Sequence, residues 1–425
     1  MRYYDRMATS RRLRIGSPAT GDNFFPRNKL RNRLLRALSR DHVAFLGPRR
    51  TGKTSILLDL AANPPEGISA VKLDLQGLRD IPAWLNLMLV ETRRLLESPP
   101  ERLTWLKQAG NQMATAGNKV AVILKRVEQI TVLGQGIKLS PGQPAVREWQ
   151  PVADQFMALL KAHQLPIYFM LDEFPWFLGH VATNHTPAEV DAALNWFRKL
   201  RLELTDMPAR FLVTGSIGLR GLLRRLNLTP AANDFDNIEI EPLTDTDAME
   251  FLGELSAGEN LNLSEDVRRR MLERLGVGWP LLLATFLAEV QDDREGLTIA
   301  VEDIDRLYDD RMVRGNRNKY CEEMFSRITK PELFSVSERR LAQEILRDLC
   351  RNLQGFGLDE LAAIHARLVP DADHRALLTG ELDFVIETLI HDGYLYRRKD
   401  PDPARDGRLE FASKILRDYW RHHTA

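Results

Sequence analysis

The chain has 425 residues, enough for roughly two to four domains with a sizeable core. Its 59 basic residues balance 59 acidic ones, so any surface that attracts nucleic acid or an anionic membrane must be local. The two cysteines, Cys321 and Cys350, lack Cys-x-x-Cys spacing, which argues against a disulfide framework or a zinc site and favours a reducing compartment. The apolar runs are too short to cross a membrane, and the arginine-rich start lacks the apolar stretch of a signal peptide. We therefore expect a cytoplasmic protein with a flexible leader over residues 1–22.

The most specific motif follows an apolar, strand-like run (42–46) and precedes a helix-forming run (55–60). It consists of Gly47, Pro48, Arg49, Arg50, Thr51, Gly52, Lys53 and Thr54. Glycines at both ends let the chain curl, so that backbone N–H groups and the positive end of the next helix converge on one anion. We expect this loop, together with Ser55, to bind the phosphates of ATP. Lys53 would reach the β- and γ-phosphates, and the Thr54 hydroxyl would hold Mg²⁺.

A second motif supplies carboxylates. Residues 167–171 are continuously apolar, as expected of a parallel strand covered on both faces. Asp172 follows at the carboxyl end of this strand, where it would bind Mg²⁺, usually through water. Glu173 would polarise the water that attacks the γ-phosphate. The alternative is that this acidic pair only caps the turn before Pro175, but the phosphate-binding loop upstream favours the catalytic role.

Other strands and helices alternate along the first half of the chain. The remaining strand-like runs are 70–75, 211–216 and 237–240, and a helical run at 152–163 lies between two of them. Thr186 and Glu189 have the spacing of a capping box and predict that a helix begins there. The alternation predicts an α/β fold with a mostly parallel sheet, whose ligand binds at the carboxyl ends of the strands.

Two parts of this first half leave open questions. Thr214 and Ser216 end one predicted strand, where either hydroxyl would lie beside the γ-phosphate and sense it. The alternative is a polar pair that simply ends a strand. Residues 97–150 fit the alternation badly because glycines and prolines interrupt them. We predict an insertion there, without assigned chemistry.

The second half of the chain is predominantly helical by pattern. Residues 242–312 predict a bundle that packs over a nucleotide as a lid. Pro280 starts one of its helices, and it either contacts adenine or ribose or only marks the helix start. Residues 313–334 are expected to be a linker, and the polar, basic stretch 311–319, which Gly315 breaks, suits a hinge.

Residues 335–425 have the pattern of three helices, a two-stranded wing and a final helix, which is typical of a winged-helix domain. The third helix carries Glu381, Asp383 and Glu387, which phosphate backbones would repel. The wing is basic, with Arg397, Arg398, Lys399, Arg405 and Arg408. We therefore favour a protein-interaction or autoinhibitory role, with shallow DNA contact through the wing as the alternative.

Several of these segments resemble the archaeal-type ATPases of the STAND and AAA-related group. The resembling stretches are NFFPR (23–27), GPRRTGKTS (47–55), FMLDEFPWFL (169–178), VTGSIG (213–218), GWP (278–280), DGYL (392–395) and FASKILRDYW (411–420). The resemblance covers most of the chain. It implies a P-loop NTPase core over residues 23–241 that includes Arg27, then the lid and the winged helix, with ATP and Mg²⁺ as cofactors. Where many members carry Gly-Arg before the last core strand, this chain has Asn233, Asp234, Phe235 and Asp236.

The resemblance further implies an ATP-dependent switch in which core, lid and winged helix move as units. Arg220, Arg224 and Arg225 follow the sensor strand, where related enzymes present an arginine finger to a neighbouring subunit. The alternative is that these arginines are solvated. Our leading hypothesis is a slow ATP hydrolase with a protein partner or self-association. A DNA-associated loader or mobile-element helper, and an ATP-bound signalling or defence scaffold with little turnover, are the competing hypotheses.

Overall fold

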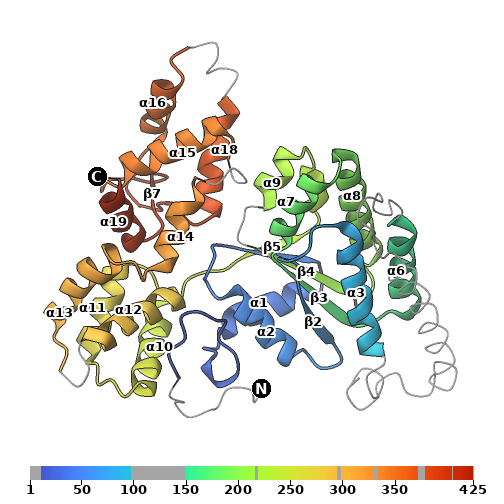
Figure 1. Cartoon of the computed structure of the whole chain (residues 1–425), viewed down its shortest axis with the longest axis horizontal. Coiled ribbons are helices and arrows are strands. Elements are labelled where there is room, and N and C mark those ends of the chain that lie inside the picture. Colours follow the sequence, from blue (N-terminus) through green and yellow to red (C-terminus); the bar gives the residue numbers. More distant parts are fainter. Residues whose placement is uncertain are drawn as a thin grey trace, which may run out of the picture.

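The structure is a computed structural model. It describes residues 11–96, 149–215, 219–293, 298–329, 334–371, 379–403 and 405–424. Three parts follow one another along the chain: a sheet flanked by helices, a bundle of helices α10 to α13, and a C-terminal region that begins at residue 334 (Figure 1). The predicted insertion and the first ten residues lie outside the described residues, apart from Trp149 and Gln150 at the end of that insertion.

The sheet has five parallel strands in the order β2-β3-β4-β1-β5. The strands are β1 (Val43–Leu46), β2 (Ser69–Asp74), β3 (Ile167–Asp172), β4 (Arg210–Gly215) and β5 (Asp236–Glu239). Leu46 at the end of β1 lies between Gly215 and Glu239, and Asp74 lies beside Asp172. The carboxyl ends therefore form one edge, and the prediction of an α/β fold with a mostly parallel sheet is confirmed.

Both faces of the sheet are covered because its strands are apolar at consecutive positions. Phe45, Met170 and Leu212 belong to the same apolar cluster as helices α1 and α2, whereas Phe169 and Phe211 belong to the cluster of α3, α6, α7 and α8. The helices of this part are α1 (Asn28–Leu38), α2 (Lys53–Ala62), α3 (Ile81–Leu96), α6 (Gln150–His163), α7 (Phe174–Asn184), α8 (Pro187–Glu203) and α9 (Leu219–Arg225). The sheet is thus the middle of three layers, and its open edge is the carboxyl edge.

Local capping signals place helix starts where the sequence predicts them. Thr186 accepts a hydrogen bond from the Glu189 N–H, and the Glu189 carboxylate accepts one from the Thr186 N–H at 2.9 Å, so the predicted capping box is confirmed. In the bundle, Thr244 and Ser264 cap α10 and α11. The bundle helices are α10 (Asp245–Gly258), α11 (Glu265–Leu275), α12 (Pro280–Asp293) and α13 (Val301–Leu307).

The described part of the C-terminal region contains four helices and a short hairpin. These elements are α15 (Val336–Leu349), α16 (Leu358–Leu368), α18 (Thr379–His391), β6 (Leu395–Arg397), β7 (Leu409–Phe411) and α19 (Lys414–His423). The two strands pair antiparallel, and Phe356 adds an isolated bridge to Leu409. We call residues 395–411 the wing. The order of elements follows the predicted pattern.

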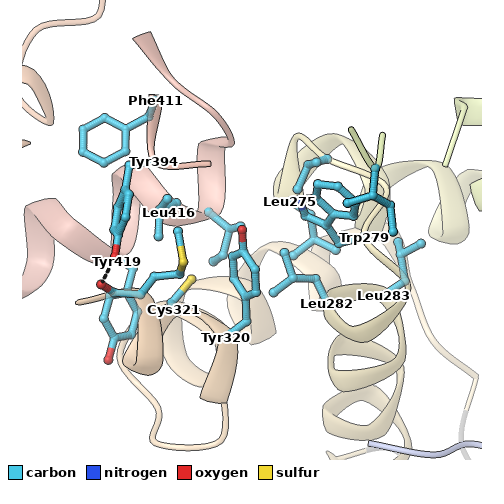
Figure 2. Close-up of a cluster of buried hydrophobic side chains, with 14 of the residues drawn as sticks. Leu275, Trp279, Leu282, Leu283, Tyr320, Cys321, Tyr394, Phe411, Leu416 and Tyr419 are labelled. Atoms are coloured by element: carbon cyan, nitrogen blue, oxygen red, sulfur yellow. Dashed lines mark hydrogen bonds between the residues drawn. The ribbon is translucent and has the colours of Figure 1, made fainter. Parts of the chain in front are cut away.

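The expected linker differs from its prediction. Helix α13 continues into a π-helical turn (Tyr308–Val313), and helix α14 (Lys319–Arg327) follows, with Tyr320, Cys321 and Met324 buried. Apolar side chains at helical spacing form α14 because they fill a gap between the bundle and the C-terminal region. Figure 2 shows Tyr320 and Cys321 between Leu275 and Leu282 on one side and Leu416 and Tyr419 on the other. We call this shared apolar cluster the seam.

The described end of the predicted flexible leader is anchored. Arg11 is 7% exposed; it pairs with Glu254 of α10 and donates to the backbone oxygens of Asp22 and Phe24. The Leu13 N–H donates to Glu259 at 2.8 Å. One buried guanidinium thus links residues 11–22 to the bundle, and the flexibility of the leader stays a prediction.

No helix in the part of the chain that the structure describes has both the length and the apolar character needed to span a membrane.

Candidate nucleotide-binding site

The glycine-rich loop leaves β1 and enters α2 at the carboxyl edge of the sheet. Gly52, the N-cap of α2, has φ 96°, a left-handed conformation that glycine adopts without the steric cost of a Cβ. Gly47 has φ 153°, and a Cβ there would lie 2.4 Å from Ile240 Cγ2. Both glycines of the motif are therefore required by the backbone. The loop curls tightly enough to direct its N–H groups, with the N-terminus of α2, toward one point.

Lys53 at the start of α2 is 6% exposed. Its ammonium donates to the backbone oxygens of Gly47 at 2.8 Å and Pro48 at 2.5 Å. Burial lowers the pKa of Lys53 to about 8, although the carboxylates of Glu173 and Asp172 oppose this shift. The Lys53 ammonium is thus a desolvated cation that donates its hydrogen bonds to backbone oxygens of its own loop.

Asp172, the last residue of β3, is 4% exposed and lies beside the loop. Its Oδ2 accepts a hydrogen bond from the Thr54 hydroxyl at 3.1 Å and lies 3.1 Å from the ammonium of Lys72 on β2. The structure therefore brings together the two residues predicted to hold Mg²⁺. A hydroxyl and a carboxylate in contact supply the oxygen ligands that this cation prefers.

Glu173 follows at the N-cap of α7 with φ 58°, which turns its side chain out of the strand direction. Its Oε2 is buried and has no hydrogen-bond partner among the residues that the structure describes. Burial raises the pKa of Glu173, while the cations of Arg49 and Lys53 oppose the shift. An unsatisfied buried carboxylate costs free energy, so its persistence here points to a ligand or water that completes it.

A cavity of about 430 Å³ opens beside these side chains. Its polar end is formed by the loop residues Arg49 to Ser55 and by Glu173. Its apolar end is lined by Phe24, Phe25, Leu243, Phe251, Leu255, Pro280, Leu281 and Ala284. Residues of the leader, Arg12 and 14–19, close one side. One end therefore suits phosphates, and the other suits a flat apolar group.

Arg27 also lines this cavity, as the N-cap of α1. It donates to the backbone oxygen of Glu241 and, at 3.5 Å, to that of Thr51 in the loop. Burial lowers its pKa to about 10 despite the nearby carboxylates of Glu241 and Asp247. Arg27 joins the glycine-rich loop to the chain that enters the bundle, so it holds the two walls of the cavity together.

The two loop arginines are bound by a residue far along the chain. Arg49 Nη1 donates to Glu323 Oε1 at 2.8 Å, and Arg50 Nε donates to Glu323 Oε2 at 2.8 Å. The Arg49 guanidinium also lies 5.5 Å from the ring centre of Trp176. In addition, a Cβ on Gly393, in the turn between α18 and β6, would lie 2.2 Å from Pro48 Cγ. Helix α14 and this turn therefore pack directly on the phosphate-binding loop.

Other predicted residues lie elsewhere. Ser216 is outside the described residues. Thr214 is buried in β4 and does not line the cavity, and its hydroxyl has no hydrogen-bond partner among the described residues. Arg224 does not face solvent alone: its guanidinium lies 4.9 Å from the ring centre of Phe384 in α18 and donates to Gly380 O at 3.2 Å. Arg220 and Arg225 share the helix α9, and the finger role of all three stays a prediction.

The segment that departs from the resembling family has a structural role. Asp234 accepts two hydrogen bonds from the guanidinium of Arg201, at 2.6 Å and 2.9 Å, and Arg201 is 1% exposed. The Arg201 guanidinium also stacks between Phe197 and Phe235, 4.4 Å and 4.1 Å from their ring centres. This part of the chain thus stabilises a buried cation beside β5.

Most basic side chains of the wing are occupied by carboxylates. Arg398 pairs with Asp400 and Glu410, each at 2.8 Å. Arg405 pairs with Asp402 at 3.7 Å, and Arg408 pairs with Glu360 at 2.6 Å. Helix α18, the element that would enter a DNA groove, packs on α9 through Phe384. This arrangement weakens the case for DNA binding.

Three parts of the site could not be predicted from the sequence. The ammonium of Lys72 lies beside Asp172, and the only signal is one lysine within an otherwise apolar strand pattern. Glu323 lies in the expected linker, where no motif marks it. The leader residues that close the cavity had been predicted as flexible, and only the buried Arg11 explains why they are held.

Comparisons with known proteins support the fold. No family model and no curated protein matches the sequence. The structure resembles a Walker-type ATPase of Pyrococcus abyssi over 98% of this chain and 99% of that one, with a TM-score of 0.54 and 17% identity. It resembles the ORC2 protein of Aeropyrum pernix, solved as ADPNP and ADP complexes, over 93% and 90%, with a TM-score of 0.45 and 12% identity. It also resembles the RuvB Holliday junction branch migration motor of Thermotoga maritima over 90% and 93%, with a TM-score of 0.40 and 15% identity. The likeness to the Pyrococcus abyssi protein shows the fold alone, which is the α/β fold of P-loop NTPases.

Proposed function

We propose that this protein binds MgATP at the carboxyl edge of its sheet and hydrolyses it slowly. The observation that carries the proposal is the buried ammonium of Lys53 beside the glycine-rich loop, together with the buried Oε2 of Glu173, which has no hydrogen-bond partner among the described residues. Desolvated charges of opposite sign, in a cavity and with pKa values moved by burial, are typical of sites that act on charged ligands. A surface turn would leave both groups in water.

The residues present fit MgATP. The loop N–H groups and Lys53 would bind the phosphates, and Thr54 with Asp172 would hold Mg²⁺, directly or through water. The bound metal supplies neutralisation of developing charge on the phosphates. Glu173 is placed to hold a water and accept its proton, because its free Oε2 faces no other donor in the part of the chain that the structure describes.

The apolar end of the cavity fits a nucleobase. Pro280 and Leu281 at the start of α12 and Phe251 of α10 come from the bundle, whereas Phe24 and Phe25 come from the chain before α1. A base in this end would be covered by the bundle and by the leader. In this proposal the sheet part is the ATPase core, the bundle is its lid, and the C-terminal region is a winged helix.

We further propose that the nucleotide state sets the position of the C-terminal region. This region meets the bundle through the apolar seam, and it meets the sheet part where Gly393 packs on Pro48 and where Arg224 contacts Phe384 and Gly380. Helix α14 adds the ion pairs of Glu323 with the loop arginines. A ligand shifts such an equilibrium only if it binds the two states with different affinity. Contacts made on the phosphate-binding loop itself supply that difference, because the ligand competes for the same side chains.

The two competing functions are less well supported. DNA association through the C-terminal region would require α18 to leave α9 and the wing to exchange its carboxylate partners for phosphates. A scaffold that binds ATP with little turnover keeps the same pocket. It differs only in the rate, so a turnover measurement with saturating MgATP separates it from a hydrolase.

The test of the main proposal is the variant Lys53→Ala. Removing the ammonium leaves the charge of the β- and γ-phosphates uncompensated in a desolvated loop, so ATP binding is expected to fall below detection. The matched control is Lys161→Ala, which removes an exposed ammonium paired with Glu203 on the sheet's helical layer. Calorimetric titration of both variants and the unaltered chain with MgATP decides. Equal affinities in the three proteins would show that the nucleotide does not bind at this loop.

A further inference from the structure

Helix α14 has two faces with different partners. One face carries Tyr320 and Cys321, which are 3% and 0% exposed in the seam between the bundle and α19. The backbone oxygen of Met324 also accepts a hydrogen bond from the Tyr394 hydroxyl at 2.9 Å (Figure 2). The other face carries Glu323, which points to the phosphate-binding loop. Helix α14 thus packs against the bundle and the C-terminal region, and it binds the phosphate-binding loop through the Glu323 carboxylate.

Glu323 binds Arg49 and Arg50 in the way that a phosphate group would bind them. Its two oxygens accept one hydrogen bond each from Arg49 and Arg50, both at 2.8 Å. Guanidinium groups bind carboxylate and phosphate oxygens in the same geometry, and such charge-assisted bonds are the strong ones. The Glu323 side chain is 18% exposed, so water screens these pairs only in part. The Glu323 carboxylate therefore binds both arginines of the loop, Arg49 and Arg50.

The same three side chains line the cavity at its phosphate end. A triphosphate entering that end brings several negative charges to within reach of the loop, where they attract Arg49 and Arg50 and repel Glu323. Burial alone raises the pKa of Glu323, but the hydrogen bonds from Arg50 and Arg49 lower it below its ordinary value, so the carboxylate is charged at neutral pH. Protonation therefore offers no way to relieve the repulsion.

We propose that Glu323 competes with the terminal phosphate of the nucleotide for Arg49 and Arg50, so that the triphosphate releases α14 from the phosphate-binding loop. This inference rests on the proposed function, because it assumes that the loop binds a nucleotide. It names Glu323 as the residue that couples phosphate binding to the position of the bundle and the C-terminal region. Nucleotide binding and the docking of α14 on the loop are then linked equilibria that weaken each other by the same factor. Removing the Glu323 carboxylate abolishes this competition, so nucleotide affinity is expected to rise by that factor.

The variant Glu323→Gln tests this competition in the full chain. It keeps the size of the side chain and removes the charge. The matched control is Glu322→Gln, one position earlier on α14, whose carboxylate is 53% exposed and pairs with Lys319 within its own helix. Calorimetry with a non-hydrolysable MgATP analogue, with MgADP and with inorganic tripolyphosphate gives the affinities. Tripolyphosphate lacks a base, so it isolates the phosphate end of the cavity.

The expected result is tighter binding of both triphosphates to Glu323→Gln, by about 5-fold to 150-fold, with a smaller gain for ADP and no change in Glu322→Gln. A second readout needs no ligand. Probes on cysteines introduced at exposed Lys199 and Arg405 report the separation of the sheet part and the wing, because both native cysteines are buried. Without nucleotide, Glu323→Gln is expected to shift this separation toward the value of the unaltered chain with the ATP analogue.

Two failures are distinguishable. If the unaltered chain binds the ATP analogue but Glu323→Gln binds it no more tightly than Glu322→Gln does, the competition is overturned and the proposed function stands. If none of the proteins binds any of the three ligands, the proposed function is overturned and this inference falls with it. A structural role for Glu323 alone would lower thermal stability in the variant and leave the ratio of ATP to ADP affinity unchanged, which also overturns the competition.

Discussion

Charged side chains differ in burial and in pairing between the carboxyl edge of the sheet and the wing. At the sheet edge, Lys53 is buried and Glu173 is half-buried, burial moves the pKa values of both, and Oε2 of Glu173 has no hydrogen-bond partner among the described residues. In the wing, Arg398 and Arg408 are matched by carboxylates at the surface. Burying charge costs several kcal/mol unless something repays it, whereas surface pairs contribute about 0–1 kcal/mol. The difference indicates where a ligand is expected to bind, because only the sheet edge keeps charge in a state that a ligand would relieve.

The largest effect is expected from Glu173→Gln. The amide keeps the shape of the side chain but cannot accept the proton of the attacking water, so turnover is expected to fall on the order of a hundredfold or more while MgATP still binds. Phosphate release at saturating MgATP, together with calorimetry, measures the two quantities separately. The matched control is Glu203→Gln, an exposed carboxylate paired with Lys161. Unchanged turnover in Glu173→Gln would remove the sheet edge from the chemistry and break the comparison.

A smaller effect is expected from pH. The pKa of Lys53 lies near 8 in the free protein, below its ordinary value, so the ammonium is lost as the pH rises through 8. Phosphates favour the charged form, and their own second pKa is about 6, so binding above about pH 8 must return a proton to Lys53. We therefore expect proton uptake on MgATP binding at about pH 9 and little at about pH 7, with affinity falling up to about tenfold per pH unit above 8.

Calorimetry in two buffers of different ionisation enthalpy measures this proton uptake. Because Glu173 also has a moved pKa, the same experiment on Glu173→Gln assigns the proton: uptake that persists in this variant belongs to Lys53. Equal binding enthalpies in the two buffers at both pH values would show that Lys53 takes up no proton, and therefore that its pKa in the free protein does not lie near 8.

The smallest effect is expected from the wing. The structure places no ion-pair partner beside Arg397 or Lys399 among the residues it describes, so the double variant Arg397→Ala with Lys399→Ala is expected to change the free energy of unfolding by less than about 0.5 kcal/mol. The paired Arg408→Ala is the contrast, with an expected loss of about 1–2 kcal/mol because it leaves Glu360 and two backbone oxygens without their donor.

Duplex DNA sharpens the same comparison. If the wing is only a solvated surface, neither the unaltered chain nor the double variant binds plain duplex at low salt. Salt-dependent binding that the double variant loses would contradict this expectation and restore the DNA-associated hypothesis.

The sequence predicts the local parts of the site well and its long-range parts poorly. The glycine pattern predicts the loop, because Gly47 and Gly52 are needed wherever that loop forms, and the apolar run before Asp172 predicts a buried strand. Glu323 could not be found in this way. It meets Arg49 across 274 positions, and its contact depends on how α14 packs, which no local pattern encodes.

The long-range contacts of the linker and of the leader could not be predicted for a related reason. Polar composition and Gly315 indicated a hinge, yet Tyr320 and Cys321 are buried by partners from both sides of the chain. Arg11 looked like one more basic residue of a leader, and only its buried pairing with Glu254 explains its position. Composition describes what a segment prefers alone, and tertiary partners overrode that preference in both cases.

The seam also limits how the chain can be divided. Leu275 and Leu282 of the bundle and Leu416 of α19 are each 0% exposed, and Tyr320 of α14 lies between them (Figure 2). A fragment that ends after the bundle would leave this apolar surface open to water, and the isolated C-terminal region would expose its complement. The three-part order along the chain therefore does not translate into three separable building blocks. We expect the bundle and the C-terminal region to fold as one unit. Truncation or recombination between them is therefore expected to yield fragments that aggregate.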